Sequence, residues 1–299
     1  MRNAFSRALI AAAKSDDRIV LLTGDHGYAL FDEFRKACPE QYINAGVAEQ
    51  NMVGVAAGLA KGGFKPFVYG LSAFIPIRVL EQIKLDICYE QLPVVFIGDG
   101  AGVVYSTLGS SHQSTEDMAV LRAIPYINIF SPCDRYEMEQ CMNLALRSLQ
   151  PSYIRMGKAD LPQIHSSLPN FQVGELCHIR DGTYKMCFIA TGSMVSTAIM
   201  ASERFDKVAV WSAPCIKPLA IAQVIAIAQS HEILVTLEEH SIYGGLGSAI
   251  AEIVSEYSPT RVYRIGIKDR FAKFCGSYQY LIQEHNLDVD SILNTIQHL

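Results

Sequence analysis

The sequence predicts an α/β protein of two layered domains, and three observations carry this prediction. Short apolar runs suited to strands alternate with longer segments suited to helices along the chain. The strand runs are continuously apolar, which is typical of a parallel sheet covered on both faces. A polar, proline-containing stretch at residues 158–185 interrupts the alternation in a chain of 299 residues. We therefore expect two three-layer α/β/α domains, at residues 1–165 and 166–299.

Each half contributes its own series of elements. In the first half we expect strands at residues 18–25, 65–70, 92–100, 127–132 and 151–157, and helices at 3–14, 51–63, 74–90, 114–124 and 134–149. In the second half we expect strands at 184–192, 207–213, 231–240 and 261–267, and helices at 193–205, 219–230, 245–257 and 288–299. Ligands of such sheets bind beyond the carboxyl ends of the strands, so residues that follow strands are candidates for chemistry.

Composition excludes several classes of protein. Half of the residues are hydrophobic and 18% are charged, which favours buried cores over disorder. The net charge of -5 and the lack of a basic run argue against a nucleic-acid surface. No apolar run reaches the ~18 residues of a membrane span, and the N-terminus lacks a secretory pattern. Eight scattered cysteines without a CxxC pair indicate reduced thiols, so we expect a cytoplasmic protein.

Glu49 is the first candidate for chemistry. It lies in "NAGVAEQNM", after a glycine-containing turn and directly before an apolar helix. A carboxylate in the first turn of a helix complements the helix dipole, so helix capping alone would explain this residue. The residues by themselves leave both interpretations open.

Seven segments resemble one known family in order and spacing. They are "AGVAEQNMVGVAAGLAKGGFKPFV", "LSAFIPIRVLEQI", "SHQSTEDMAVLRAIP", "IATGSMVSTA", "IKPL", "TLEEHSIYGGLGSAIAE" and "RIGIKDRFAKFCGSYQYL". Together they are similar to the C-terminal half of the transketolase family, meaning its pyrimidine-binding domain followed by its small C-terminal domain. The resemblance covers nearly the whole chain.

The resemblance implies a thiamine diphosphate site. Glu49 matches the glutamate that contacts N1′ of the cofactor's aminopyrimidine and controls its protonation. A carboxyl group held away from water keeps its proton more easily, which suits that role. Phe74 would stack on the pyrimidine, Leu71 stands where many relatives carry a second aromatic residue, and Asp25 and Arg78 would lie beside the cofactor. Mg²⁺ or Ca²⁺ would be held mainly by a partner subunit, so we expect no metal ligands here.

The resemblance also implies a catalytic histidine. His112, in "GSSHQ", matches the histidine that reaches the substrate hydroxyls and helps to move protons during ketol transfer. An imidazole that titrates near neutral pH suits this task. Gln113 would support it.

The sequence departs from ordinary transketolases at the substrate site. Gly100 replaces a phosphate-binding histidine, Lys158 stands at the arginine position with Arg155 nearby, and Ala29 falls near a serine. Leu108 replaces an acidic residue that reads a substrate hydroxyl. A site built to hydrogen-bond a hydroxyl rejects analogues without it, and an apolar residue reverses the preference. We expect a deoxy, oxo or nucleotide-linked sugar acceptor rather than the usual sugar phosphates.

Two further patterns look like ligand sites and are interpreted otherwise. Asp99 in "VVFIGDGAG" and Asn128 have the spacing of a Mg²⁺–diphosphate loop, but the family register puts Asn128 on the next strand. "GGLGSA", residues 244–249, lacks the third glycine of a dinucleotide loop, so we expect a tight turn before a helix. His240 lacks a second metal ligand at helical spacing, which favours a surface or interface role.

The leading functional interpretation is the C-terminal subunit of a split, thiamine diphosphate-dependent transketolase. It requires a separate N-terminal, diphosphate-binding subunit, in a dimer of heterodimers. The alternative enzyme is the β-like subunit of a 2-oxo acid dehydrogenase E1, which shares this architecture. From a different class, the chain would be a non-catalytic subunit that completes an assembly.

Overall fold

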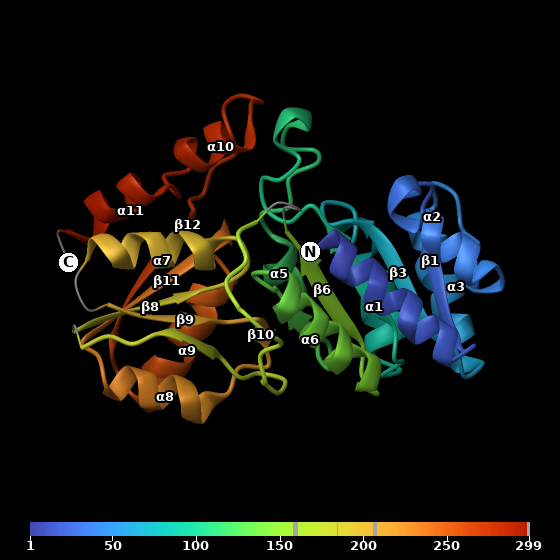
Figure 1. Cartoon of the computed structure of the whole chain (residues 1–299), viewed down its shortest axis with the longest axis horizontal. Coiled ribbons are helices and arrows are strands. Elements are labelled where there is room, and N and C mark those ends of the chain that lie inside the picture. The colour runs from blue at the N-terminus through green and yellow to red at the C-terminus, as the bar shows by residue number, and fades with distance from the viewer. Residues whose placement is uncertain (158–160, 184, 206–207, 298–299) are drawn as a thin grey trace.

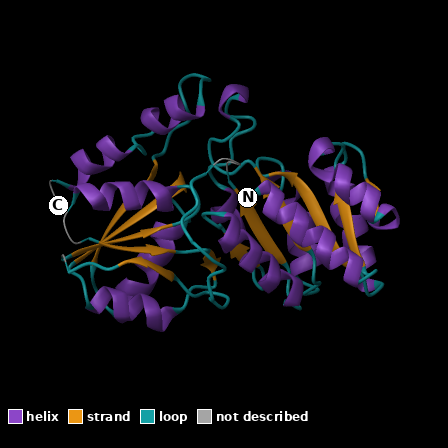
Figure 2. Ribbon diagram, in the orientation of Figure 1, coloured by secondary structure: helices purple, strands orange, loops and turns teal. Residues whose placement is uncertain are grey.

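The computed structural model describes residues 1–157, 161–183, 185–205 and 208–297, and it forms two layered α/β units side by side (Figure 1). Helices cover both faces of each sheet, as Figure 2 shows, so the predicted fold class is confirmed. Among the described residues, no helix has the length and apolar character needed to cross a membrane.

The first sheet has seven strands in the order β10-β5-β6-β4-β3-β1-β2. Its strands are β1 (Ile19–Thr23), β2 (Tyr42–Asn44), β3 (Lys65–Leu71), β4 (Val95–Asp99), β5 (Asn128–Phe130), β6 (Ser152–Met156) and β10 (Cys215–Lys217). All pairs are parallel except β10 with β5. The carboxyl ends of β1, β3 and β4 therefore lie along one edge.

Alternate residues of these strands face two helical layers. Tyr69 and Ile97 pack with α1 (Arg2–Ser15), α2 (Tyr28–Ala37) and α6 (Arg135–Arg147). Val68 and Phe96 pack on the other side with α3 (Glu49–Lys61), η3 (Ile83–Cys88) and α5 (Asp117–Arg122). Burial on both faces explains why these strands are apolar without alternation.

The second sheet has the order β12-β11-β8-β9-β7. Its strands are β7 (Cys177–Arg180), β8 (Met186–Ala190), β9 (Ala209–Ser212), β11 (Ile233–Ser241) and β12 (Arg261–Ile267). One face packs with α7 (Met194–Arg204), α10 (Tyr278–Glu284) and α11 (Val289–Ile296), and the other with α8 (Ile221–Gln229) and α9 (Leu246–Tyr257).

Three details differ from the sequence-based expectation. The sheets are not wholly parallel, because β7 and β10 are antiparallel edge strands. Strand β10 joins the first sheet although it lies beyond residue 165, so one sheet crosses the expected boundary. The helix expected at 74–90 is broken into η2 (Ile77–Val79), α4 (Leu80–Gln82) and the π-helical η3. Pro76, which cannot donate a backbone hydrogen bond, precedes these short pieces.

The GDG segment does not form a metal loop. Asp99 ends β4, whereas Asn128 begins β5, and the register with β6 aligns Asn128 with Val95. The two side chains therefore lie at opposite ends of their strands. Asn128 instead donates to Ser148 Oγ at 3.3 Å.

Candidate active site

Glu49 is the first residue of α3, and its side chain is about one tenth exposed. The helix begins shortly after β2 because Gly46, with φ +70°, turns the chain at the sheet edge. A carboxylate at this position is stabilised by the free N–H groups of the helix start. Helix capping and a chemical role are therefore compatible in the same residue.

Arg78 connects Glu49 with Phe74. Arg78 Nη1 donates to Glu49 Oε1 at 3.3 Å, and the guanidinium carbon lies 3.7 Å from the centre of the Phe74 ring. The arginine side chain is half exposed, so it is not locked in place by packing. A planar cation thus contacts a nearly buried carboxylate and an aromatic face at once.

His112 completes this group from a distant part of the chain. Its ring meets the Phe74 ring edge to face, with 5.3 Å between centroids. Ser111 Oγ lies 3.0 Å from His112 Nδ1, which leaves Nε2 as the nitrogen available to a ligand. Gln113 is buried beside it, and its Nε2 has no hydrogen-bond partner among the described residues.

The pocket beside this group has a volume of about 500 Å³ and is lined by Val47, Ala48, Glu49, Gln50, Asn51 and Arg78. Val47 is 76% exposed, so the pocket opens to the surface of this chain. The arrangement fits an aminopyrimidine in shape, because the planar Arg78 guanidinium contacts Glu49 and the Phe74 ring together, so a flat nitrogen-containing group has room there. Glu49 and Phe74 are the residues that would hold it, with Arg78 beside them.

Asp25 and Leu71 lie on the same strand edge. Asp25 follows β1 with φ 59°, and its carboxylate accepts from Asn44 Nδ2 at 3.0 Å. Asn44 Oδ1 in turn accepts from Gly46 N, which links Asp25 to the turn before Glu49. Leu71 ends β3 opposite Asp99, and its carbonyl accepts from Phe74 N and so shapes the Phe74 turn.

The backbone conformation and a neighbouring ring both require glycine at position 100. Its φ of +84° favours glycine, and a Cβ atom there would come within 2.0 Å of the Tyr105 ring. Tyr105 Oη donates to Asp99, which also accepts from Arg2 and Tyr69. No larger side chain fits at position 100 unless Tyr105 moves.

The other residues predicted to bind the substrate lie in different surroundings. Leu108 is half exposed near the tip of the loop that carries His112. Arg155 is 3% exposed, and its guanidinium donates to Asp117 and to the carbonyls of Ser114 and Glu239. Direct substrate binding by Arg155 stays a prediction, and in this chain its Nε and Nη2 are committed to protein partners. Lys158 lies outside the described residues.

The buried Glu239 anchors the His112 loop to the second unit. Its carboxylate accepts from Val103 N at 2.8 Å, from Tyr278 Oη at 2.6 Å and from Ser193 Oγ. Gly276 N also donates to Ser106 O at 3.5 Å, so the loop packs against the segment before α10. The position of His112 therefore depends on both units.

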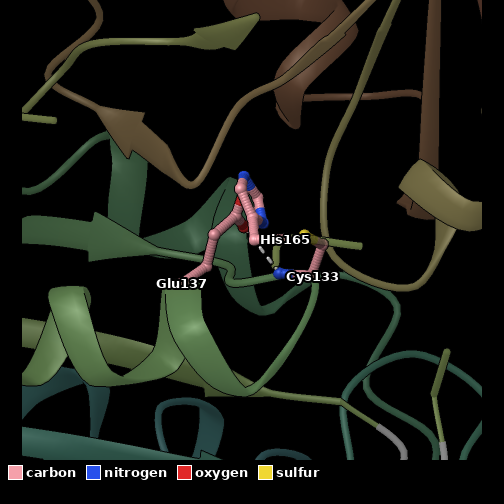
Figure 3. Close-up of side chains that lie close together, drawn as sticks. All are labelled: Cys133, Glu137 and His165. Carbon is pink, nitrogen blue, oxygen red and sulfur yellow. Dashed lines mark hydrogen bonds and ion pairs between the residues drawn. The ribbon is translucent and has the colours of Figure 1, made fainter. Parts of the chain in front are cut away.

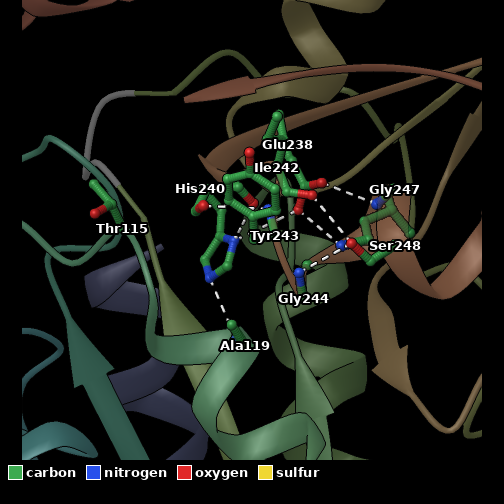
Figure 4. A network of polar contacts seen from close by, with 12 residues as sticks. Thr115, Ala119, Glu238, His240, Ile242, Tyr243, Gly244, Gly247 and Ser248 are labelled. Carbon is green, nitrogen blue, oxygen red and sulfur yellow. Dashed lines mark hydrogen bonds and ion pairs between the residues drawn. The ribbon is translucent and has the colours of Figure 1, made fainter. Parts of the chain in front are cut away.

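The glycine-rich turn at residues 244–249 is a helix start, as expected. Glu238 accepts from Leu246 N at 2.7 Å and Gly247 N at 2.9 Å, so the chain's own carboxylate fills the anion-binding end of α9 (Figure 4). Burial raises the pKa of Glu238 to about 7 and lowers the pKa of His240 to about 4. His240 is wholly buried at the junction, where Ala119 N donates to it at 3.4 Å.

Sequence reasoning missed two groups of side chains. One is the Asp99 network with Arg2, Tyr69 and Tyr105, and the other brings together Cys133, Glu137 and His165 (Figure 3). In both groups at least one member comes from a segment far from the others in the chain. The i, i+4 spacing of Cys133 and Glu137 was the only local signal.

Comparison with known proteins identifies the two units. Residues 1–163 match the family described as "Transketolase, pyrimidine binding domain", and residues 175–292 match "Transketolase, C-terminal domain". The chain is 35% identical to a protein of Phocaeicola vulgatus named as one of the subunits of apulose-4-phosphate transketolase, covering 98% of this chain and 95% of that protein. It is 33% identical to "6-deoxy-6-sulfo-D-fructose transketolase subunit SqwH" of Clostridium sp., covering 98% and 92%.

A solved structure agrees with these relatives. "Split gene transketolase, inactive beta4 tetramer" superposes with a TM-score of 0.90 at 31% identity, covering 99% of this chain and 96% of that one. Glu49 stands at the start of α3, inside the segment that matches the pyrimidine-binding domain. The chain therefore belongs to the transketolase family, as a transferase-type subunit with the domains of its C-terminal half.

Proposed function

We propose that this chain is the pyrimidine-binding subunit of a split, thiamine diphosphate-dependent transketolase, which transfers a two-carbon ketol unit to a sugar acceptor. The contact of Arg78 with both Glu49 and Phe74 is the observation that supports the proposal most, because it shows that one flat, nitrogen-containing group can reach this carboxylate and this aromatic face together. Thiamine diphosphate would supply the carbanion chemistry when bound. The chain's own residues orient the pyrimidine and control its proton.

Glu49 is the proposed proton-controlling residue. Its carboxylate is nearly buried and faces the pocket, so it can hold N1′ of the aminopyrimidine through one short hydrogen bond. Arg78 would give up this carboxylate when the pyrimidine binds. Phe74 would then offer its ring face to the pyrimidine instead of to the guanidinium.

His112 is the proposed group that contacts the substrate. Its edge lies against Phe74, and Ser111 restricts the other side of its ring. A histidine in this place can exchange a proton with a hydroxyl of the ketose or of the acceptor aldehyde. Gln113 and Asp25 would support the site from either side.

A partner subunit completes the proposed site. The pocket opens outward beside Val47, and the described part of this chain offers no acidic loop there for a diphosphate-bound metal. We infer that an N-terminal, diphosphate-binding subunit holds the diphosphate with Mg²⁺ or Ca²⁺, in a dimer of heterodimers. Two relatives are themselves named as transketolase subunits, which favours this function over a 2-oxo acid dehydrogenase.

The acceptor sugar is proposed to be unusual. Tyr105 occupies the place of any side chain at position 100, and the exposed Leu108 offers no hydrogen bond to a hydroxyl. Relatives named for apulose 4-phosphate and for a 6-deoxy-6-sulfo sugar support a departure from common substrates. Lys158 and Arg155 remain proposed contributors to anion recognition.

The test is ketol transfer by the two-subunit complex. Sugar phosphates, deoxy sugars and sulfonated sugars are offered with thiamine diphosphate and Mg²⁺, and products are separated by mass. We expect transfer with at least one unusual sugar and little with the pair ribose 5-phosphate and xylulose 5-phosphate. Efficient turnover of that pair would refute the substrate proposal, and decarboxylation of 2-oxo acids alone would favour the dehydrogenase alternative.

A further inference from the structure

Cys133, Glu137 and His165 meet in the interior at the junction of the two units (Figure 3). One potential ligand atom from each of them lies within 4.8 Å of the other two. Glu137 lies in the first turn of α6 and Cys133 two residues before that helix, whereas His165 belongs to the segment that leads to the second unit. The group is separate from the Glu49 pocket, which these residues do not line.

Three buried side-chain atoms at this centre have no partner at hydrogen-bond geometry among the described residues. They are Glu137 Oε1, His165 Nε2 and Ser212 Oγ. Ser212 lies near the Glu137 carboxylate, and His165 Nε2 lies 3.8 Å from Glu137 Oε1, which is beyond a hydrogen bond. Glu137 and Ser212 are wholly buried, and a buried polar atom without a partner costs about 1–3 kcal/mol. A group that binds all of them would remove that cost.

The other atoms of these residues are already held in orientations that suit a metal. Glu137 Oε2 accepts from Cys133 N at 2.7 Å, which fixes the carboxylate and leaves Oε1 free to coordinate. His165 Nδ1 lies 3.3 Å from Asp134 Oδ2, and Asp134 also accepts from His165 N at 2.7 Å. A histidine whose Nδ1 bonds to a carboxylate presents Nε2 as the metal ligand, and such outer partners accompany most metal-bound histidines.

The distances between the ligand atoms and the charges of the ligands indicate which metal would bind. His165 Nε2 and Glu137 Oε1 are 3.8 Å apart, and bond lengths near 2.1 Å in a tetrahedral zinc site put such ligands about 3.4 Å apart. A thiolate and a carboxylate together neutralise a divalent cation in a buried place. This set of ligands, with one sulfur, one imidazole nitrogen and one carboxylate oxygen, is typical of Zn²⁺ rather than of Mg²⁺ or Ca²⁺.

We propose that Cys133, Glu137 and His165 bind a structural Zn²⁺ ion, with Ser212 Oγ or a water molecule as the fourth ligand. The ion would tie together the start of α6, the segment between the units and the end of β9. His165 is 14% exposed and provides the route of entry. This site is independent of the proposed ketol transfer, and no step of that reaction uses it.

The experiment measures zinc in the full-length chain. The protein is loaded with Zn²⁺ under a non-chelating reductant, desalted, and analysed by elemental mass spectrometry. We expect one ion per wild-type chain, as for a structural zinc site, and at least about a tenfold loss in Cys133→Ser and His165→Gln. Cys275→Ser, which changes an exposed thiol outside the group, is the matched control and should retain the ion.

A second readout uses Co²⁺ in place of Zn²⁺. Thiolate coordination gives a charge-transfer absorption that must vanish in Cys133→Ser and persist in Cys275→Ser. His165→Gln changes a partly exposed residue, so it remains a folded test if Cys133→Ser does not fold. Wild-type chains without zinc after loading, or unchanged zinc in His165→Gln, would overturn the proposal and leave an interior ion pair of His165 with Glu137 as the explanation.

Discussion

Arg78 Nη1 lies 3.3 Å from Glu49 Oε1 while the same guanidinium covers the Phe74 ring at 3.7 Å. Glu49 and Phe74 are the two groups expected to hold the aminopyrimidine, and here a side chain of the protein holds them. Arg78 is half exposed, so its displacement breaks two contacts of a solvated cation and costs little. The proposed pyrimidine contacts of this chain therefore require the movement of Arg78 and no other change.

Phe74 supplies the stacking surface in this account. Phe74→Ala should raise the concentration of thiamine diphosphate needed for half activity by about 3- to 10-fold, since aromatic pairs contribute about 0.5–1.5 kcal/mol. Phe74→Tyr keeps the ring and is the matched control. Calorimetric titration of the two-subunit complex measures both, and equal affinity in Phe74→Ala and wild type would argue against stacking.

His112 should affect substrate more than cofactor. His112→Ala should lower kcat/KM for ketol transfer about 100-fold, the usual loss when a proton-transferring group is removed. Thiamine diphosphate affinity should change little, because His112 contacts the Phe74 ring rather than the Glu49 carboxylate. Titration and steady-state kinetics separate the two effects. A loss confined to cofactor affinity would mean that His112 only supports the stacking ring.

A substitution at Leu108 tests which substrates the enzyme prefers. It is half exposed, so Leu108→Asp should leave the thermal unfolding temperature nearly unchanged. The new carboxylate can accept a hydrogen bond from a hydroxyl. The ratio of kcat/KM for hydroxylated substrates to kcat/KM for deoxy substrates should therefore rise about tenfold. Leu149→Asp, at a surface leucine distant in sequence, is the control. If the ratio of kcat/KM for the two substrates does not change, Leu108 does not contact the substrate.

Arg155 should matter for stability. It is buried against Asp117 and bonds to carbonyls on both units, so Arg155→Ala should cost about 3–5 kcal/mol of unfolding free energy by leaving Asp117 unpaired. The exposed pair of Arg204 with Asp290 offers the control, and Arg204→Ala should cost under about 1 kcal/mol. Urea unfolding compares them, and equal losses would contradict this interpretation of the junction.

The strands were the most predictable part of the molecule. Continuous apolar runs located β1, β3, β4 and β8 because strands buried on both faces must be apolar throughout. The sequence did not reveal β2, β7 or β10, which are three or four residues long and lie at sheet edges. Too few residues remain in such strands for a pattern to be recognised.

The site was predictable only through the family resemblance. Spacing alone could not join Glu49 or Phe74 with His112, because their contacts depend on how the sheet orders its strands. The Tyr105 ring beside Gly100 was equally hidden, since only the backbone conformation brings it there. The burial of Arg155 follows from packing between the two units, which no local pattern records.

Reconstitution with Glu49→Gln tests whether this chain is a split transketolase subunit that depends on the Glu49 carboxylate. The chain is combined with an N-terminal, diphosphate-binding transketolase subunit, thiamine diphosphate and Mg²⁺, and ketol transfer is measured against the chain alone. Glu90→Gln, an exposed carboxylate, serves as the control. Transfer is expected only in the mixture, with at least about a 100-fold loss in Glu49→Gln and none in Glu90→Gln. Activity of the chain alone would refute the split enzyme, and wild-type turnover by Glu49→Gln would refute the role of this carboxylate.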